Sequence, residues 1–311
     1  MPRRGVSATP VTTDIDVAVG VLRGGGIIGL PTETVYGLAA RVSDRVAVSR
    51  VFAAKGRPVG HPLIVHVSSA AQAARYAHLD ARAQALASAL WPGPLTILLP
   101  RTAEVPDNVT GGRQTVAVRV PAHPMALEVI DRLGEGLVAP SANRFGHVSP
   151  TSPSHVIADL DGLIDLVLDG GPCHVGVEST IVDCTGPLQV LRPGAISGED
   201  IEAICGELIV PTTGESRAAG MLASHYAPRA RVHLVADAES SRTAAAALPD
   251  GATVRTIGEG LDAQSYAEAL YRMLREADTD GITDVIAVLP TGDGLAAAVR
   301  DRLTKAAAER T

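Results

Sequence analysis

Residues 26–38 read Gly-Ile-Ile-Gly-Leu-Pro-Thr-Glu-Thr-Val-Tyr-Gly-Leu. The first half of this stretch is apolar and flanked by glycines, which predicts a buried strand over Ile27 to Leu30. The second half opens with a proline and carries hydroxyls, a carboxylate and a tyrosine, so the strand should end in a polar loop, where binding sites are commonly built. Hydroxyl-rich segments after strands also form ordinary turns that satisfy their own backbone. The stretch by itself leaves both interpretations open.

The residues around this stretch alternate between helical and extended patterns. A helix is expected from an Asp14 cap to the glycines at 24–26, because its apolar residues recur at helical spacing and glycine ends helices. A second helix should begin after Asp44 and end at Lys55-Gly56. Further helices are expected at about 71–90, 123–134, 153–160 and 197–205, and further strands at 63–67, 95–99, 115–120, 137–139, 166–168 and 179–182.

This alternation predicts an α/β fold whose sheet is mixed and twisted. The connections from Leu168 to Ser179 and from Val182 to Val190 are short and rich in glycine and proline. Crossover helices between parallel strands do not fit such connections. We therefore expect neighbouring antiparallel strands at both places.

A second, smaller domain is predicted at the C-terminal end. Residues 206–230 lack periodicity and are typical of an interdomain linker, which would act as a lid if it ordered over a bound ligand. Residues 231–311 alternate strand and helix patterns, which predicts a small Rossmann-like βαβαβα unit with a parallel sheet. The expected boundaries are 1–205, 206–230 and 231–311.

Composition excludes several classes of function. The 311 residues carry a formal net charge of -7, so a global basic surface for nucleic acid or anionic membranes is not expected. The three cysteines form no close pair, and the histidines at 61 and 66 have no cluster of acidic or cysteine partners, so neither a disulfide framework nor a protein-bound metal is predicted. No apolar run approaches the length of a membrane helix and no secretory leader is recognisable, so a cytoplasmic location is expected.

Four groups of residues would suit an anionic ligand with several charges. Lys55 and Arg57 are two cations separated by a glycine at a helix end, and Ser141 and Asn143 follow a predicted strand. Arg119 and Arg192 each lie in an otherwise apolar, strand-like run; they complete the four groups. An arginine within a strand more often marks a solvated face or an edge than a ligand contact. Taken separately, none of these groups establishes a function.

Taken together, the motifs of the chain resemble those of the threonylcarbamoyl-AMP synthases, the YrdC-type enzymes in their longer, two-domain form. The resemblance covers nearly the whole chain. It rests on Pro-Thr-Glu-Thr-Val-Tyr-Gly-Leu at 31–38, Lys-Gly-Arg at 55–57, Pro-Leu-Ile-Val-His-Val at 62–67, Trp-Pro-Gly-Pro-Leu-Thr at 91–96, Val-Arg-Val-Pro at 118–121, Ala-Pro-Ser-Ala-Asn at 139–143, Glu-Ser-Thr-Ile-Val-Asp at 178–183, Leu-Arg-Pro-Gly at 191–194 and His-Tyr-Ala-Pro at 225–228.

The resemblance implies a YrdC-like catalytic domain and a defined reaction. L-threonine, bicarbonate and ATP would give L-threonylcarbamoyl-AMP and pyrophosphate, with Mg²⁺ on the nucleotide. The product would serve the formation of threonylcarbamoyladenosine in tRNA through separate transferase machinery, with weak or indirect contact between this chain and tRNA. Positioning of the threonine carbamate against the α-phosphorus, and cations for the departing pyrophosphate, are what such a reaction needs.

The resemblance also implies roles for individual residues. The catalytic residues would be Lys55, Arg57, Ser141 and Asn143. The residues that contact the nucleotide would be Lys55, Arg57, His61, Thr115, Ser141, Ser149, Arg192 and Tyr226. The residues that hold threonine would be Thr34, Tyr36, His66, Arg119, the backbone of Ala139, and Ser179. No protein ligand to a metal is implied.

Two positions depart from the family pattern. His61 stands where the family commonly has asparagine, and a histidine can replace one amide donor but not the paired donor and acceptor of an amide. Ala218-Ala219 replaces a common Ser-Pro in the linker, and loss of the proline should loosen the conformation of this segment.

Two other functions compete with this interpretation. One is a carbamoyltransferase that uses carbamoyl phosphate and ATP, although chains of that kind carry additional acylphosphatase or kinase-like domains. The other is an RNA-binding or ribosome-associated module, which the acidic net charge disfavours. A gel shift with tRNA and ATP turnover driven by threonine would distinguish these functions.

Overall fold

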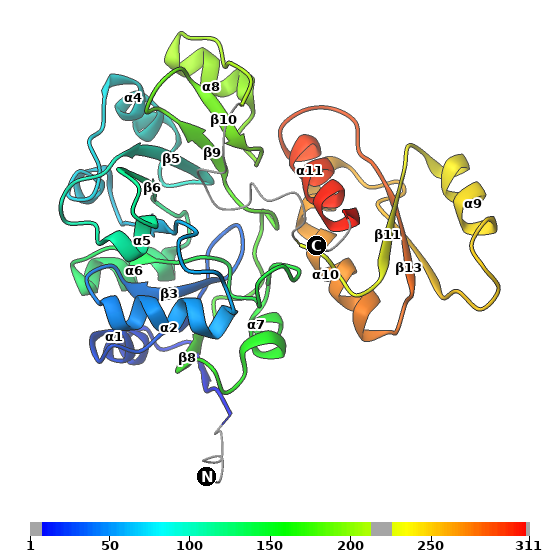
Figure 1. Cartoon of the computed structure of the whole chain (residues 1–311), viewed down its shortest axis with the longest axis horizontal. Coiled ribbons are helices and arrows are strands. Elements are labelled where there is room, and N and C mark those ends of the chain that lie inside the picture. Colours follow the sequence, from blue (N-terminus) through cyan, green and yellow to red (C-terminus); the bar gives the residue numbers. More distant parts are fainter. Residues whose placement is uncertain (1–7, 213–225, 309–311) are drawn as a thin grey trace.

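A computed structural model describes residues 8–212 and 226–308, and these residues form two sheets covered by helices (Figure 1). Residues 8–212, the first unit, build a ten-stranded mixed sheet in the order β1-β8-β2-β3-β7-β4-β6-β5-β9-β10. Its strands are β1 Val11–Thr12, β2 Ile28–Leu30, β3 Gly37–Arg41, β4 Ile64–His66, β5 Leu95–Pro100, β6 Thr115–Arg119, β7 Leu137–Val138, β8 Leu166–Leu168, β9 Thr180–Asp183 and β10 Gln189–Arg192.

The first two predicted helices are confirmed together with their caps. Helix α1, Ile15–Arg23, begins after Asp14, whose carboxylate accepts hydrogen bonds from two backbone amides of the first turn. Helix α2, Arg45–Lys55, begins after Asp44 in the same way and ends at Gly56, whose φ of 62° is left-handed and suits glycine. Helix α2 therefore has Lys55 in its last turn, and Arg57 follows directly after the Gly56 cap.

The remaining helices of the first unit cover both faces of the sheet. In β3, Leu38 packs with the core on the side of α2, whereas the next residue, Ala39, packs with the core on the side of α1. The predicted helix at about 71–90 is two helices, α3 and α4, with a break between them. The helices are α3 Ala70–Ala73, α4 Ala81–Leu90, α5 Asp107–Thr110, α6 Pro124–Leu133, α7 Pro153–Leu160 and α8 Gly198–Cys205.

The polar stretch at 31–36 connects two strands of a hairpin. Strand β3, which the sequence did not predict, runs antiparallel to β2, with Leu30 opposite Gly37. Between them, the Thr32 hydroxyl accepts hydrogen bonds from the amides of Thr34 and Val35, at 3.2 Å each, and donates to the Val35 carbonyl at 2.6 Å. The turn interpretation of this stretch therefore holds for its backbone.

One of the two expected antiparallel pairs is confirmed and the other is wrong. Strands β9 and β10 pair antiparallel, but β8 lies between β1 and β2, far along the sheet from β9. The connection at 169–179 has no helix, yet an extended chain of this length spans roughly 35 Å or more. Along the way, its backbone amides donate hydrogen bonds to loop carbonyls: Cys173 N to Thr151 O at 2.9 Å and Val175 N to Glu33 O at 2.8 Å.

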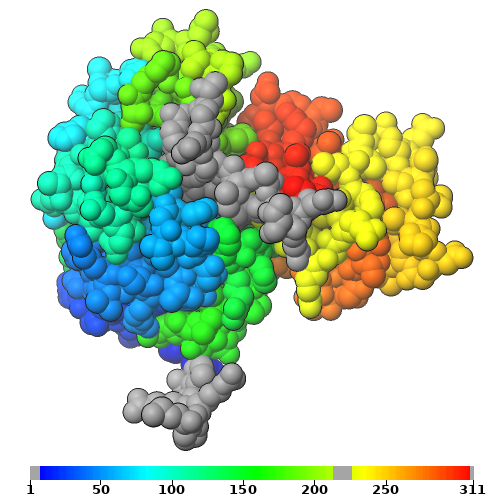
Figure 2. Space-filling view, viewed as in Figure 1, coloured from blue at the N-terminus to red at the C-terminus, as the bar shows by residue number. Residues whose placement is uncertain are grey.

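Residues 226–308 form the predicted βαβαβα unit, called here the C-terminal unit. Its three strands are all parallel in the order β11-β13-β12. Helices α10 and α11 lie on the side of this sheet that faces the first unit, and the two units lie side by side (Figures 1 and 2). The elements are β11 Arg231–Val235, α9 Ala238–Ala246, β12 Val254–Ile257, α10 Ala263–Thr279, β13 Asp284–Val288 and α11 Leu295–Ala307.

The two units share one apolar core cluster. Val35 and Val177 of the first unit pack with Leu270 and Tyr271 of α10. Residues 213–225 of the expected lid, including the Ala218-Ala219 departure, lie outside the described residues. The predicted domain boundaries stay predictions.

Candidate active site

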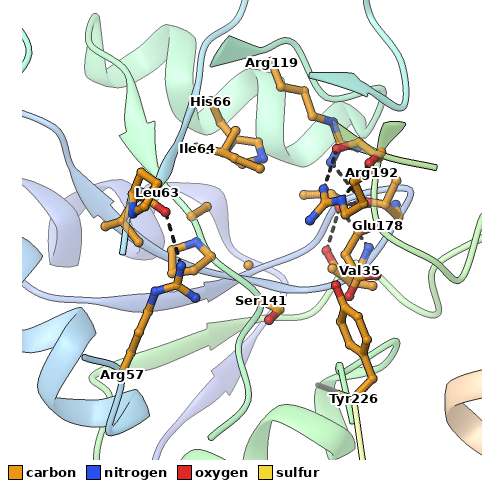
Figure 3. A pocket seen from close by; sticks show the side chains of 17 residues that line it. Val35, Arg57, Leu63, Ile64, His66, Arg119, Ser141, Glu178, Arg192 and Tyr226 are labelled. Carbon is orange, nitrogen blue, oxygen red and sulfur yellow. Dashed lines mark hydrogen bonds between the residues drawn. The ribbon is translucent and has the colours of Figure 1, made fainter. Parts of the chain in front are cut away.

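The polar loop and the ends of several strands meet in one cavity (Figure 3). The parallel strands β4 and β6 place their last residues, His66 and Arg119, opposite each other at this cavity. Strand β10 ends there with Arg192. The cavity is lined by Thr32, Thr34, Val35, Gly37, Arg57, Pro62, Leu63, Ile64, His66, Arg119, Ala139, Pro140, Ser141, Glu178, Ser179, Arg192 and Tyr226.

Three buried guanidiniums line the cavity. Arg57 and Arg192 point into it from opposite sides in the view of Figure 3, and Arg119 enters beside His66. Burial lowers the pKa of Arg57 only to about 10, so this side chain remains charged at neutral pH, and burial also lowers the pKa of Arg192. This concentration of positive charge suits a ligand with several anionic groups.

Arg119 is held by the first unit but keeps part of its hydrogen-bonding capacity. Its Nε donates to the Gly93 carbonyl at 3.2 Å and its Nη1 donates to the Thr34 hydroxyl at 2.9 Å. Its Nη2 lies 2.7 Å from Oε1 of Glu33, in an ion pair without hydrogen-bond geometry. Within the described residues, Nη2 and both Glu33 oxygens have no hydrogen-bond partner. Arg119 can therefore still bind a carboxylate.

Arg192 holds the segment in front of β9. Its Nε donates to the Ser179 carbonyl at 3.0 Å and its Nη2 donates to the Ser179 hydroxyl at 3.1 Å. The Ser179 hydroxyl also lies 2.7 Å from the Thr96 hydroxyl. Ser179 is thus fixed from two sides at the cavity wall.

His66 presents a neutral imidazole to the cavity. Burial, and next the Arg119 guanidinium, lower the pKa of His66 to about 3. Its Nδ1 is buried and has no hydrogen-bond partner among residues 8–212 and 226–308. A neutral ring nitrogen without a partner can accept or donate one hydrogen bond to a ligand, depending on its tautomer.

Lys55 is buried and is not among the residues that line the cavity. Its Nζ donates to the carbonyl of Ser141 and, at 2.6 Å, to the carbonyl of Asn143. Asn143 in turn donates from Nδ2 to the carbonyls of Arg144 and His147, at 2.8 Å each. These bonds fix the turn that carries Ser141 into the cavity. Burial, and then the Arg57 charge, hold the pKa of Lys55 well below its usual range.

The remaining predicted site residues divide into those at the cavity and those behind it. Thr34, Ala139, Ser141, Ser179 and Tyr226 line the cavity, as do the three arginines and His66. The others are not among the lining residues: Tyr36 donates to the Gly171 carbonyl at 2.7 Å, Ser149 donates to Glu178 at 2.6 Å, the rings of His61 and Phe145 pack edge to face with centroids 5.8 Å apart, and Thr115 is the first residue of β6. The ligand roles assigned to all these residues stay predictions.

The sequence interpretation missed Glu178 and its partners in the C-terminal unit. The Glu178 carboxylate accepts hydrogen bonds from Tyr271 and from Arg302, at 2.8 Å each. Burial by itself raises the pKa of Glu178, but Arg302, Arg192 and the hydrogen bonds outweigh it and lower the pKa to about 2. One signal was available: on helix α11, Arg302 shares a face with Ala298, Val299 and Ala306, at spacings of three and four residues, and a solvated arginine is not expected on an apolar face.

The described residues contain neither a metal-binding cluster nor a helix that could span a membrane. Over residues 8–212 and 226–308, no group of three or more histidines, cysteines, aspartates or glutamates could hold a metal ion. In the same residues, no helix has the length and apolar composition that crossing a membrane requires. Cys173, Cys184 and Cys205 are free thiols.

Comparisons with known proteins cover almost the whole chain. The Sua5, YciO and YrdC family model, described as telomere recombination, matches residues 20–194, and the model of the threonylcarbamoyl-AMP synthase C-terminal domain matches residues 196–308. A threonylcarbamoyl-AMP synthase of Pyrococcus abyssi is 40% identical over 95% of this chain and 94% of its own length. One of Bacillus subtilis is 36% identical over 94% and 92%. The crystal structure of P. abyssi Sua5 complexed with L-threonine is 38% identical, with a TM-score of 0.90 over 96% of this chain and 97% of that one.

Proposed function

This chain belongs to the threonylcarbamoyl-AMP synthase family, and on that premise we propose that it converts L-threonine, bicarbonate and ATP into L-threonylcarbamoyl-AMP and pyrophosphate. The observation that carries the proposal is the cavity with three buried guanidiniums, a neutral histidine and hydroxyls. ATP and threonine together bring a triphosphate and a carboxylate, which need such cations. The product is the activated group for threonylcarbamoyladenosine in tRNA.

Threonine binds at the Arg119 side of the cavity in this proposal. Nη2 of Arg119, which makes an ion pair with Glu33 but no hydrogen bond to a described residue, donates to the threonine carboxylate. Nδ1 of His66 also has no hydrogen-bond partner in the described residues and bonds the threonine hydroxyl. Thr34, Ser179 and the backbone of Ala139 border the same place, as the wall of a small amino-acid pocket.

The nucleotide binds between Arg57 and Arg192. Arg57 is the cation that faces the β- and γ-phosphates, and Ser141 donates its hydroxyl to them. Lys55 fixes the turn that carries Ser141, through its hydrogen bonds to the carbonyls of Ser141 and Asn143. Tyr226 also lines the cavity and contacts the nucleotide in this proposal. His61, Thr115 and Ser149 are not among the lining residues. A nucleotide that contacts them must therefore extend beyond the cavity.

The chemical step needs positioning more than a base. Threonine and bicarbonate first form a carbamate, with loss of water. A carbamate oxygen then attacks the α-phosphorus, the bond from that phosphorus to the bridging oxygen breaks, and pyrophosphate leaves. Buried cations that are fixed before the reaction stabilise the charge that develops on the leaving group. Arg57 and Arg192 supply these cations.

Mg²⁺ enters this proposal as part of the substrate. The phosphate oxygens of ATP would hold it, and no set of described side chains is assigned to it. We further propose that the reaction takes place in the cytoplasm and that separate transferase machinery passes the threonylcarbamoyl group to tRNA, with weak or indirect contact between this chain and tRNA.

The test is pyrophosphate release with each substrate omitted in turn. Release should require ATP, threonine and bicarbonate together, and mass spectrometry should find threonylcarbamoyl-AMP. Release without bicarbonate, or turnover driven by carbamoyl phosphate in place of threonine and bicarbonate, would contradict the proposal. Tight, salt-sensitive tRNA binding without turnover would favour the RNA-binding alternative instead.

A further inference from the structure

Glu178 is a cavity-lining carboxylate whose hydrogen-bond donors come from both units. From the first unit, the Ser149 hydroxyl donates to Oε1 at 2.6 Å. From the C-terminal unit, Tyr271 Oη and Arg302 Nε donate to Oε2 at 2.8 Å each. Arg302 is 1% exposed and Glu178 is 6% exposed, so this ion pair is shielded from water. A buried carboxylate with three donors is held in one position.

The same two residues of the C-terminal unit also contact Tyr226. The guanidinium carbon of Arg302 lies 5.3 Å from the centre of the Tyr226 ring, within the range of a cation–π contact. Tyr271 stacks on that ring, with centroids 5.8 Å apart and planes inclined by 28°. Tyr226 has a φ of 61°, a left-handed backbone that is unfavourable for a tyrosine and must be maintained by its surroundings.

Glu178 also adjoins the residues that carry ligand roles. Its neighbour in the chain, Ser179, is bonded to Arg192 through both its carbonyl and its hydroxyl. Its partner Ser149 was assigned to the nucleotide, as were Arg192 and Tyr226. A shift of Glu178 would therefore move the nucleotide side of the cavity first.

We propose that Arg302 and Tyr271 are positioning residues of the active site, which fix the Glu178 carboxylate and the Tyr226 ring and thereby preorganise the nucleotide side of the cavity. This inference rests on the proposed function. Arg302 is not needed merely to attach the two units, because Arg275 of α10 makes a separate ion pair with Asp159 at 2.9 Å. The C-terminal unit is thus a part of the active site.

Two variants test the proposal in the full-length chain. Arg302→Lys keeps a positive charge but loses the planar fork that bonds Glu178 and faces Tyr226. Tyr271→Phe removes only the hydroxyl and keeps the ring, so it should fold even if Arg302→Lys does not. We expect Arg302→Lys to raise the KM for ATP about 10-fold or more and Tyr271→Phe to raise it about threefold, with the KM for threonine changed less than either.

Calorimetric titration with ATP gives a second readout that does not require turnover, and the dissociation constant should rise in the same order. Asp284→Asn is the matched control: it removes a buried carboxylate of the same unit, whose partners are His233 and Thr283. That variant should lower the melting temperature without changing the KM for ATP.

Unchanged ATP affinity in folded Tyr271→Phe and Arg302→Lys protein would overturn the inference, as would equal changes for ATP and threonine that follow the melting temperature. These outcomes differ from failure of the proposed function, in which the wild-type chain releases no threonine-dependent pyrophosphate. In that case the ATP titrations still decide whether Arg302 and Tyr271 support the nucleotide side.

Discussion

Two buried glutamates pair with arginines at the cavity, and their surroundings differ: Glu178 lines the cavity and pairs with Arg302, whereas Glu33 pairs with the lining residue Arg119. Glu178 accepts hydrogen bonds from Ser149, Tyr271 and Arg302, whereas the two oxygens of Glu33 accept none from the described residues, although Oε1 lies 2.7 Å from Arg119 Nη2. The region around Glu178 is completed by the fold itself. The region around Glu33 and Arg119 still has hydrogen-bonding capacity, which a ligand can use. The comparison separates the residues that build the site from those that recognise a substrate.

The largest expected effect concerns substrate choice at the Arg119 side. A site whose buried groups bond a substrate hydroxyl rejects an analogue that lacks it, by as much as ~10⁴-fold. Valine, which has almost the shape of threonine, should therefore release little pyrophosphate with ATP and bicarbonate. Serine keeps the hydroxyl and serves as the control, with a loss of about 1 to 3 kcal/mol for the missing methyl. Equal rates with valine and threonine would show that this side is not built for the hydroxyl.

The next effect compares the two glutamates directly. Glu178→Gln leaves the buried Arg302 without its full counter-charge, and we expect the free energy of unfolding to fall by roughly 3 kcal/mol. Glu33→Gln removes the counter-charge 2.7 Å from the buried Arg119 but breaks no hydrogen bond to a described residue, so it should cost less stability than Glu178→Gln, which also weakens three hydrogen bonds, while it changes the KM for threonine through Arg119. Urea unfolding of both variants, with threonine kinetics, provides the measurement. Similar losses of stability in the two variants would remove the distinction.

A third effect concerns the cations. Arg57→Ala should lower turnover by roughly 10²-fold with the fold intact, because it removes a preorganised charge at the nucleotide side. Lys55→Ala should lower both turnover and stability, since Lys55 bonds the carbonyls of Ser141 and Asn143. The control is Arg50→Ala, which removes the exposed ion pair between Arg50 of helix α2 and Asp165. Wild-type turnover in folded Arg57→Ala protein would refute the role of this cation.

The smallest effect is a dependence of stability on pH. The folded state keeps His66 neutral down to a pKa of about 3, whereas the unfolded chain protonates it near its ordinary value of 6.5. The unfolded state binds more protons below that value, so stability should fall as pH drops from about 6.5, by at most roughly 1.4 kcal/mol per pH unit for this group. Urea unfolding between pH 7.5 and 5 would measure it.

His66→Gln should reduce that slope, and substitution of the exposed His78 serves as the control. The pKa of Glu178, at about 2, keeps its own acid transition below this range. A slope that His66→Gln leaves unchanged would show that another group, such as His155 with its pKa lowered to about 4, dominates acid destabilisation.

The sequence predicted well wherever short-range signals decide the structure. The caps at Asp14 and Asp44 fixed the starts of two helices, and glycine fixed their ends. Strand β3 was missed because Gly-Leu-Ala-Ala-Arg lacks the β-branched and aromatic residues that mark strands, and its hairpin partner supplies the missing preference. The position of β8 was missed because a connection without a helix need not join neighbouring strands.

In the site, too, residues marked by local sequence signals were predicted, and residues placed by long-range contacts were missed. Arg57 was singled out at a helix end, and Arg119 and Arg192 within apolar, strand-like runs; all three line the cavity. Arg302 and Tyr271 act on Glu178 from more than ninety residues away in the chain, and no local pattern encodes such a contact. The expectation that Lys55 faces the ligand stays a prediction, and its bonds to the carbonyls of Ser141 and Asn143 are a property of the packed fold that the sequence did not express.

The Thr32 hydroxyl, which bonds the backbone of its own loop, bears on the entropy of binding. A loop residue loses about 1 to 2 kcal/mol of conformational freedom at 25 °C when its backbone is fixed. Here that loss occurs during folding, because residues 32–35 are already bonded in the free protein. A small substrate such as threonine has few atoms with which to compensate for the ordering of a loop. Because this loop is already ordered, threonine binds without the additional cost of ordering it.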